Sequence, residues 1–212
     1  MEFDFMKQLR RTTGRTKSDV ANKLISMFLH ELSRRVSLSL GMAVSHPIYH
    51  DDIVRSFGNR CIYCRCALET DRVAVEHLEG MNRQRAGLHV PGNVAISCKR
   101  CNNEKRRDDQ KKDVGLAESG WESFLSHDGT RCNNKCKSCH YWSIIYPDSS
   151  KRAWVMRESK FEILEFRKKY QQFTQWSDNA RPHIHAKIEK LYRDCQKFAT
   201  DEIESLVGEM FP

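Results

Sequence analysis

The chain has 212 residues, and 36 Lys and Arg against 28 Asp and Glu give a formal net charge of +8 and a pI of about 9.1. No segment approaches the ~20 consecutive apolar residues of a membrane span, and the charged N-terminus lacks the apolar core of a secretory signal. We therefore expect a cytoplasmic protein with no membrane partner. Nine cysteines, an odd number, in a reducing compartment argue against a disulfide framework and indicate metal thiolates.

The N-terminal region, residues 1–57, is predicted to be basic and helical. Ser18 or Asp19 can cap a helix. The apolar positions of that helix recur at three- and four-residue spacing: Val20, Leu24, Met27, Phe28 and Leu32. Pro47 interrupts this pattern, and a second, short helix is expected at about 51–57.

Two CxxC pairs follow, Cys61 with Cys64 and Cys98 with Cys101. A CxxC turn places two thiolates on one side of an ion, and zinc takes four soft ligands in a tetrahedron. Two such turns close the coordination sphere, so the pairs predict a structural zinc site. Cys66 offers a second register, although Cys64 and Cys66 are too close in an extended chain to be the natural pair.

The residues between and after these pairs resemble the HNH, or ββα-metal, endonuclease family. The matching motifs are Cys61-x2-Cys64, Glu76-His77, Gly92-Asn93-Val94 and Cys98-x2-Cys101-Asn102-x2-Lys105. The resemblance implies an α+β fold with a ββα-metal core. It implies that His77 is the general base and that Asn93 holds its ring. Glu76 and Asn102 would then bind the catalytic divalent ion, Mg²⁺ or Mn²⁺.

The chemistry of these residue types supports that resemblance. Phosphodiester hydrolysis needs a base near neutral pKa, which an imidazole provides, and a cation against the developing charge. Carboxylate and amide oxygens are hard ligands suited to Mg²⁺. Adjacent residues of a strand point to opposite faces, so Glu76 and His77 cannot both face the phosphate in an ideal strand. The resemblance implies a locally twisted hairpin that solves this.

Basic residues accompany the motif and predict contacts with the phosphates of double-stranded DNA. Five lie within or after the second CxxC pair, and two more lie in the loop between the His and Asn positions. They are Lys99, Arg100, Lys105, Arg106 and Arg107, with Arg83 and Arg85 in the loop.

A second cysteine cluster suggests a second structural zinc. Cys132, Cys136 and Cys139 supply three thiolates, and His127 is the preferred fourth ligand. His140, Cys195 and Cys66 are alternative fourth ligands. The same spacing also occurs in the iron–sulfur motif of radical-SAM enzymes, whose fold needs a larger barrel, and unliganded thiols remain a third interpretation.

Four regions are expected along the chain. They are the helical region 1–57, the ββα-metal nuclease core 58–112, the second cysteine cluster as a zinc-binding insertion 113–145, and a helical region 146–212. Within the last of these, Arg181-Pro182 is expected to break the helix.

The sequence thus favours a metal-dependent endonuclease that hydrolyses DNA to 5′-phosphate and 3′-hydroxyl ends. By analogy with small bacterial or phage HNH proteins, it would serve in restriction or phage defence, alone or with a partner protein of a defence system. Cleavage of a palindrome would suit a homodimer. The alternative is a non-catalytic, zinc-stabilised nucleic-acid-binding module or a targeting subunit of a larger complex. RNA as substrate is a third reading.

Overall fold

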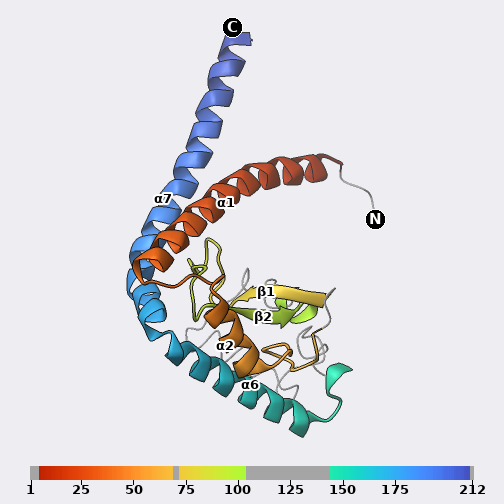
Figure 1. Ribbon diagram of the computed structural model, residues 1–212. Helices are drawn as coiled ribbons and strands as arrows, with labels where there is room; N and C mark the ends of the chain where they lie inside the picture. The colour runs from red at the N-terminus through yellow and green to blue at the C-terminus, as the bar shows by residue number, and fades with distance from the viewer. Residues whose placement is uncertain (1–4, 69–71, 104–143, 211–212) are drawn as a thin grey trace.

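The computed structural model describes residues 5–68, 72–103 and 144–210 (Figure 1). Its named elements are the helices α1 (Phe5–Ser39), α2 (Pro47–Phe57), α6 (Ser149–Lys169) and α7 (Gln171–Met210) and the strands β1 (Val73–His77) and β2 (Val94–Cys98). Residues 99–103 are helical and follow β2 without a break. Helices together with a small sheet confirm the α+β class. Among the described residues, no helix has the length and apolar character needed to cross a membrane.

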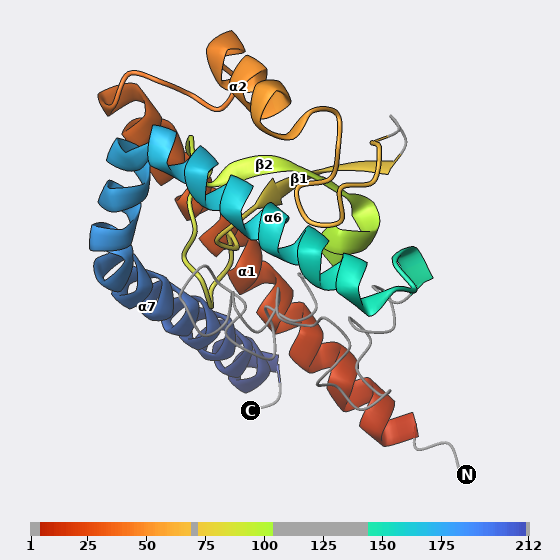
Figure 2. The ribbon, with the colours of Figure 1, turned by 90° about the horizontal axis from the view of Figure 1, so that it is seen from below.

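The sheet consists of β1 and β2, which pair antiparallel with Val73 opposite Cys98 and His77 opposite Val94. Figures 1 and 2 show the helices arranged around this small sheet, with α6 and α7 forming one bent arc and α1 packed on α7. Toward their free ends, α1 and α7 diverge (Figure 1). A two-stranded sheet is only marginally stable alone, so the helices supply most of the buried contacts.

An aromatic cluster joins α2 and α6 to the start of β2. Tyr49 of α2 is fully buried, and its hydroxyl accepts a hydrogen bond from Gly92 N at 3.1 Å and donates one to Val94 O. Its ring lies 4.9 Å from that of Tyr170 and 5.8 Å from that of Phe166. These contacts fix the end of the sheet at which β1 finishes and β2 begins.

Gly92 is required at this junction for two reasons. Its φ of 81° lies in the left-handed region, which favours glycine. A Cβ here would also lie 2.8 Å from Thr174 Cγ2 and 2.9 Å from Tyr170 Cβ, both too close. The glycine thus allows α7 to approach the chain just before Asn93.

The buried face of α1 differs from the predicted one. Val20 and Met27 are 59% and 68% exposed, and Leu24 is also exposed. The residues that enter the core lie one position along, at Ala21, Ile25, Leu29 and Val36. Phe28 and Leu32 pack against that core as expected. The helix also runs through Ser18 and Asp19 and does not begin there.

The predicted interruption and the short helix after it are present, because α1 ends at Ser39 and α2 begins at Pro47. Pro47 is itself the first residue of α2, where its missing N–H costs nothing and the side chain of His46 caps Ile48 N at 3.2 Å. The prediction for Pro182 was wrong. Pro182 lies inside α7 and does not end it. The break between the last two helices comes earlier, at Tyr170.

Candidate metal centre and its polar neighbourhood

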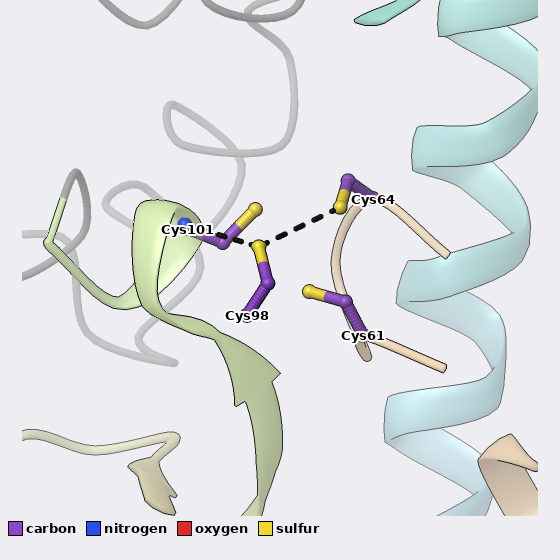
Figure 3. A group of neighbouring side chains, drawn as sticks. All are labelled: Cys61, Cys64, Cys98 and Cys101. Carbon is purple, nitrogen blue, oxygen red and sulfur yellow. Dashed lines mark hydrogen bonds between the residues drawn. The ribbon is translucent and has the colours of Figure 1, made fainter. Parts of the chain in front are cut away.

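Four buried cysteines converge to form the clearest candidate site in the described residues. The Sγ atoms of Cys61, Cys64, Cys98 and Cys101 all lie within 4.8 Å of one another (Figure 3). Zinc–sulfur bonds of about 2.3 Å place tetrahedral thiolates about 3.8 Å apart. The Sγ atoms of Cys64 and Cys98 are separated by 3.8 Å. The cysteine tetrad can therefore hold a metal ion such as zinc.

The local fold positions each pair of thiols. Cys61 and Cys64 lie on a tight turn in which Arg65 N donates to Cys61 O at 2.9 Å. Cys98 ends β2, and Cys101 lies one helical turn later, with its main-chain N–H donating to Cys98 Sγ at 3.4 Å. An N–H directed at sulfur stabilises a thiolate, which is the form that binds metal.

The pKa shifts in the tetrad follow from burial and mutual hydrogen bonding. Burial raises the pKa of the Cys61 thiol to about 12 and also raises that of Cys101 well above its usual range. Hydrogen bonds from Cys101, Cys61 and Cys64 lower the pKa of Cys98. Burial disfavours the thiolate form that metal binding needs, and a divalent cation bound to the four sulfurs would offset that cost.

Cys66 lies beside the tetrad but is not one of its members. Its Sγ is 3.3 Å from that of Cys64, and its side chain is only partly buried. A hydrogen bond with Cys61 raises the pKa of the Cys66 thiol. The tetrad thus uses the register predicted from the two CxxC pairs.

Helix α6 and the segment before it hold the first CxxC turn in place. Ser159 Oγ donates to Tyr63 O at 2.8 Å, and Tyr146 Oη donates to Cys64 O at 2.5 Å. Helix α6 and the residues before it therefore brace the cysteine tetrad. The predicted second cluster, at His127, Cys132, Cys136 and Cys139, lies outside the described residues, as does His140.

Glu76 and Asn102 come together across the sheet. Asn102 Nδ2 lies 3.0 Å from Glu76 Oε2 and 3.3 Å from Val75 O. Ser97 Oγ is 3.5 Å from the same carboxylate oxygen. Glu76 is buried, while Asn102 is partly exposed on the helical residues after β2. The amide faces the carboxylate with its NH2 group, so an ion held by both residues would need the amide turned to present its oxygen, the atom that binds a hard divalent cation.

His77 pairs with a histidine that the sequence analysis did not identify. His77 Nε2 lies 2.9 Å from Nδ1 of His89, which belongs to the loop between the strands. The main chain of His89 is fixed to α1, because its N–H donates to Ser33 Oγ at 2.8 Å. Burial, with a contribution from nearby His30, lowers the pKa of His89. The two rings share a hydrogen bond between Nε2 of His77 and Nδ1 of His89.

Asn93 folds the loop that contains His89. Its Oδ1 accepts from Glu79 N at 2.7 Å, and its Nδ2 donates to Glu79 O at 3.0 Å and Leu88 O at 2.7 Å. These bonds are to main chain, whereas the sequence analysis expected Asn93 to hold the ring of His77. Asn93 acts on the two imidazoles through the loop backbone.

Replacing Asn93 with alanine is expected to destabilise the protein by about 3 kcal/mol, because a buried polar group that loses its partner costs about 1–3 kcal/mol. The change leaves three main-chain groups of Glu79 and Leu88 without the amide that satisfied them. Urea unfolding would measure the loss. Asn59→Ala, at an exposed position, is the control and should change the free energy of unfolding little. Equal stability of the two variants would contradict this role of Asn93.

Two of the basic residues predicted to contact DNA are used inside the protein. Arg83 forms a bidentate ion pair with Glu189 of α7 at 2.6 and 2.7 Å and stacks over the Tyr192 ring at 3.6 Å. Arg85 is buried, and its main-chain oxygen accepts a hydrogen bond from Arg181 at 3.0 Å. Arg83 through its side chain and Arg85 through its main-chain oxygen attach the loop to α7, and their contacts with DNA stay a prediction.

The remaining basic residues lie within the second CxxC pair or follow it. Lys99 and Arg100 are exposed on the helical turn between Cys98 and Cys101. Lys105, Arg106 and Arg107 lie outside the described residues. The described part of the predicted DNA surface thus adjoins the metal centre.

Comparison of the chain with protein-family models, with curated proteins and with solved structures gives no match.

Proposed function

We propose that the protein is a metal-dependent endonuclease of the HNH type that hydrolyses DNA. The observation that carries the proposal is the contact between Glu76 and Asn102 on a sheet whose first strand ends at His77. Two antiparallel strands followed directly by helical residues are the order of elements that a ββα-metal core needs. The cysteine tetrad would hold the structural zinc that clamps these elements together.

The candidate base has a partner that can orient it. His89 contacts Nε2 of His77, so we assign proton transfer to the other ring nitrogen, Nδ1. A base held by a second group keeps one tautomer and one orientation, which general-base catalysis requires. The attachment of His89 to Ser33 makes α1 part of that support.

In the proposed hydrolysis one proton is taken from water and one is given to the leaving oxygen. His77 takes a proton from water as the water oxygen bonds to phosphorus, and the bond from phosphorus to the 3′ oxygen breaks. The 3′ oxygen takes a proton from solvent and leaves as a hydroxyl, with the phosphate on the 5′ end. A divalent ion at Glu76 and Asn102 would supply positive charge against the phosphate and leaving oxygens.

Cleavage of supercoiled plasmid is expected to require added Mg²⁺ or Mn²⁺. Purified protein should nick or linearise plasmid with either ion and leave it intact without added divalent ions, while its zinc content stays constant. DNA binding without cleavage under every ion condition would favour the zinc-stabilised binding module or the targeting subunit.

Asn102→Ala tests the ion site against a matched neighbour. The variant should need roughly tenfold more Mg²⁺ for half-maximal cleavage, because metal sites typically lose 10–100-fold when a supporting group is removed. Asn103, the next residue, is exposed, and Asn103→Ala should behave as the wild type. The same Mg²⁺ requirement in both variants would remove Asn102 from the site.

The proposal also includes a role in restriction or phage defence, a homodimer and a partner protein.

A further inference from the structure

A large pocket lies along α1, next to the proposed active site. Its volume is about 940 Å³, and its walls come from α1 and from the segment 41–46 that follows it. The apolar lining includes Met27, Leu38, Met42 and Val44. Pockets that bind small organic molecules commonly have volumes of about 300–1,000 Å³.

His89 connects this pocket to the proposed base. It belongs to the pocket lining, and its Nδ1 lies 2.9 Å from His77 Nε2. On the pocket side, the His89 ring lies 5.9 Å from the ring of His30 on α1. Only the side chain of His89 would therefore separate the pocket from a phosphate bound at His77. The nucleoside next to that phosphate could then reach the pocket.

The chemistry of the lining suits a nucleobase with phosphates on either side. Methionine and aliphatic side chains with two imidazoles provide surfaces for a flat heterocycle. Lys23 contributes positive charge, which complements the phosphate backbone. The one carboxylate in the lining, Glu31, pairs with Arg34 and Arg35 at 2.8 Å, and these hydrogen bonds lower its pKa to about 2.

We propose that the pocket is a subsite for one nucleoside of the cut strand, next to the scissile phosphate. The inference rests on the proposed function, because His77 defines where that phosphate lies. A nucleobase held in the pocket is unstacked from its neighbours. The free-energy cost of unstacking is lower in a single strand than in a duplex. Contacts along α1 would then give the enzyme its preference for particular bases.

Two methionines of the lining report occupancy directly. In protein labelled with ¹³C at the methionine methyl groups, thymidine 5′-monophosphate and a short single-stranded oligodeoxynucleotide should shift the NMR signals of Met27 and Met42. The signal of Met210, exposed near the end of α7, should not move. The proposal is overturned if neither probe shifts Met27 and Met42. This readout does not depend on cleavage, so it separates failure of the subsite from failure of the proposed function.

A matched pair of variants tests the role of the pocket in catalysis. Met27→Trp fills the pocket from an exposed position and should raise KM roughly tenfold with kcat little changed, the size expected for loss of one stacked base. Val20→Trp lies two helical turns away on the same face of α1, outside the lining, and should leave KM unchanged. Equal KM values in both variants would overturn the proposal. Circular dichroism would confirm that both are folded.

Discussion

Cys98→Ser is expected to remove one zinc equivalent and to unfold the region around the sheet. Structural zinc contributes about 10–16 kcal/mol in small zinc-binding domains, whereas whole domains are stable by about 5–15 kcal/mol. The free energy lost with the zinc would therefore equal or exceed the whole free energy of unfolding of a typical domain. We expect the thermal midpoint to fall by at least about 10 °C, with zinc content measured by mass spectrometry on the same sample.

Cys98 is the most informative position for this test because it belongs both to strand β2 and to the cysteine tetrad. It ends β2, pairs with Val73 in the register, and its Sγ accepts the main-chain N–H of Cys101. The serine oxygen preserves the side-chain shape but is a poor zinc ligand. A stable variant that keeps its full zinc content would show that the tetrad holds no structural ion.

Cys66→Ser provides the matched control. Its thiol lies 3.3 Å from Cys64 Sγ but is not part of the tetrad. It therefore has the same surroundings as the four cysteines without being a predicted metal ligand. We expect this variant to keep both zinc content and thermal midpoint. A zinc loss equal to that of Cys98→Ser would instead make Cys66 a ligand, the alternative register of the first pair.

The metal centre was predictable from sequence because short covalent spacing determines its geometry. Two residues within a CxxC turn are held near each other whatever the rest of the chain does. Glu76 and Asn102 were likewise paired by the resemblance, and the structure brings them within 3.0 Å. The two assignments differ in strength, since only the tetrad follows from spacing alone.

His89 could not be predicted, because nothing local places it against His77. It lies in an irregular loop whose main chain is held by a hydrogen bond from Asn93 to Leu88 O, the residue before His89. Arg83 is a similar case, because its partner Glu189 is distant in sequence. Pairings of this kind depend on tertiary packing, which composition and periodicity do not encode.

The helix faces show a different limit. On α1, apolar residues recur on two overlapping stripes, and either stripe satisfies the helical period. The stripe through Ala21, Ile25 and Leu29 is buried, whereas Val20 and Met27 remain exposed. The periodicity identified the helix, but the elements that pack against α1 determine which of its faces is buried.

His77→Ala is expected to lower plasmid cleavage by roughly 10²–10⁴-fold while the protein keeps its fold and its zinc. His77 is the last residue of β1 and lies outside the cysteine tetrad, so its loss should cost little stability. Loss of activity with retained DNA binding would separate catalysis from binding. Cleavage rates would be measured at saturating Mg²⁺ so that a weakened ion site does not contribute.

The histidine controls follow from the same geometry. His50→Ala, on the exposed face of α2, should cleave at the wild-type rate. His89→Ala should lower kcat by less than His77→Ala does, because His89 orients the base without receiving the proton. His89→Asn, whose amide can still hydrogen-bond to His77, should recover part of that loss. If His77→Ala cuts as fast as the wild type, the base lies elsewhere and the HNH proposal fails, because no other step assigned to the site removes a proton from water.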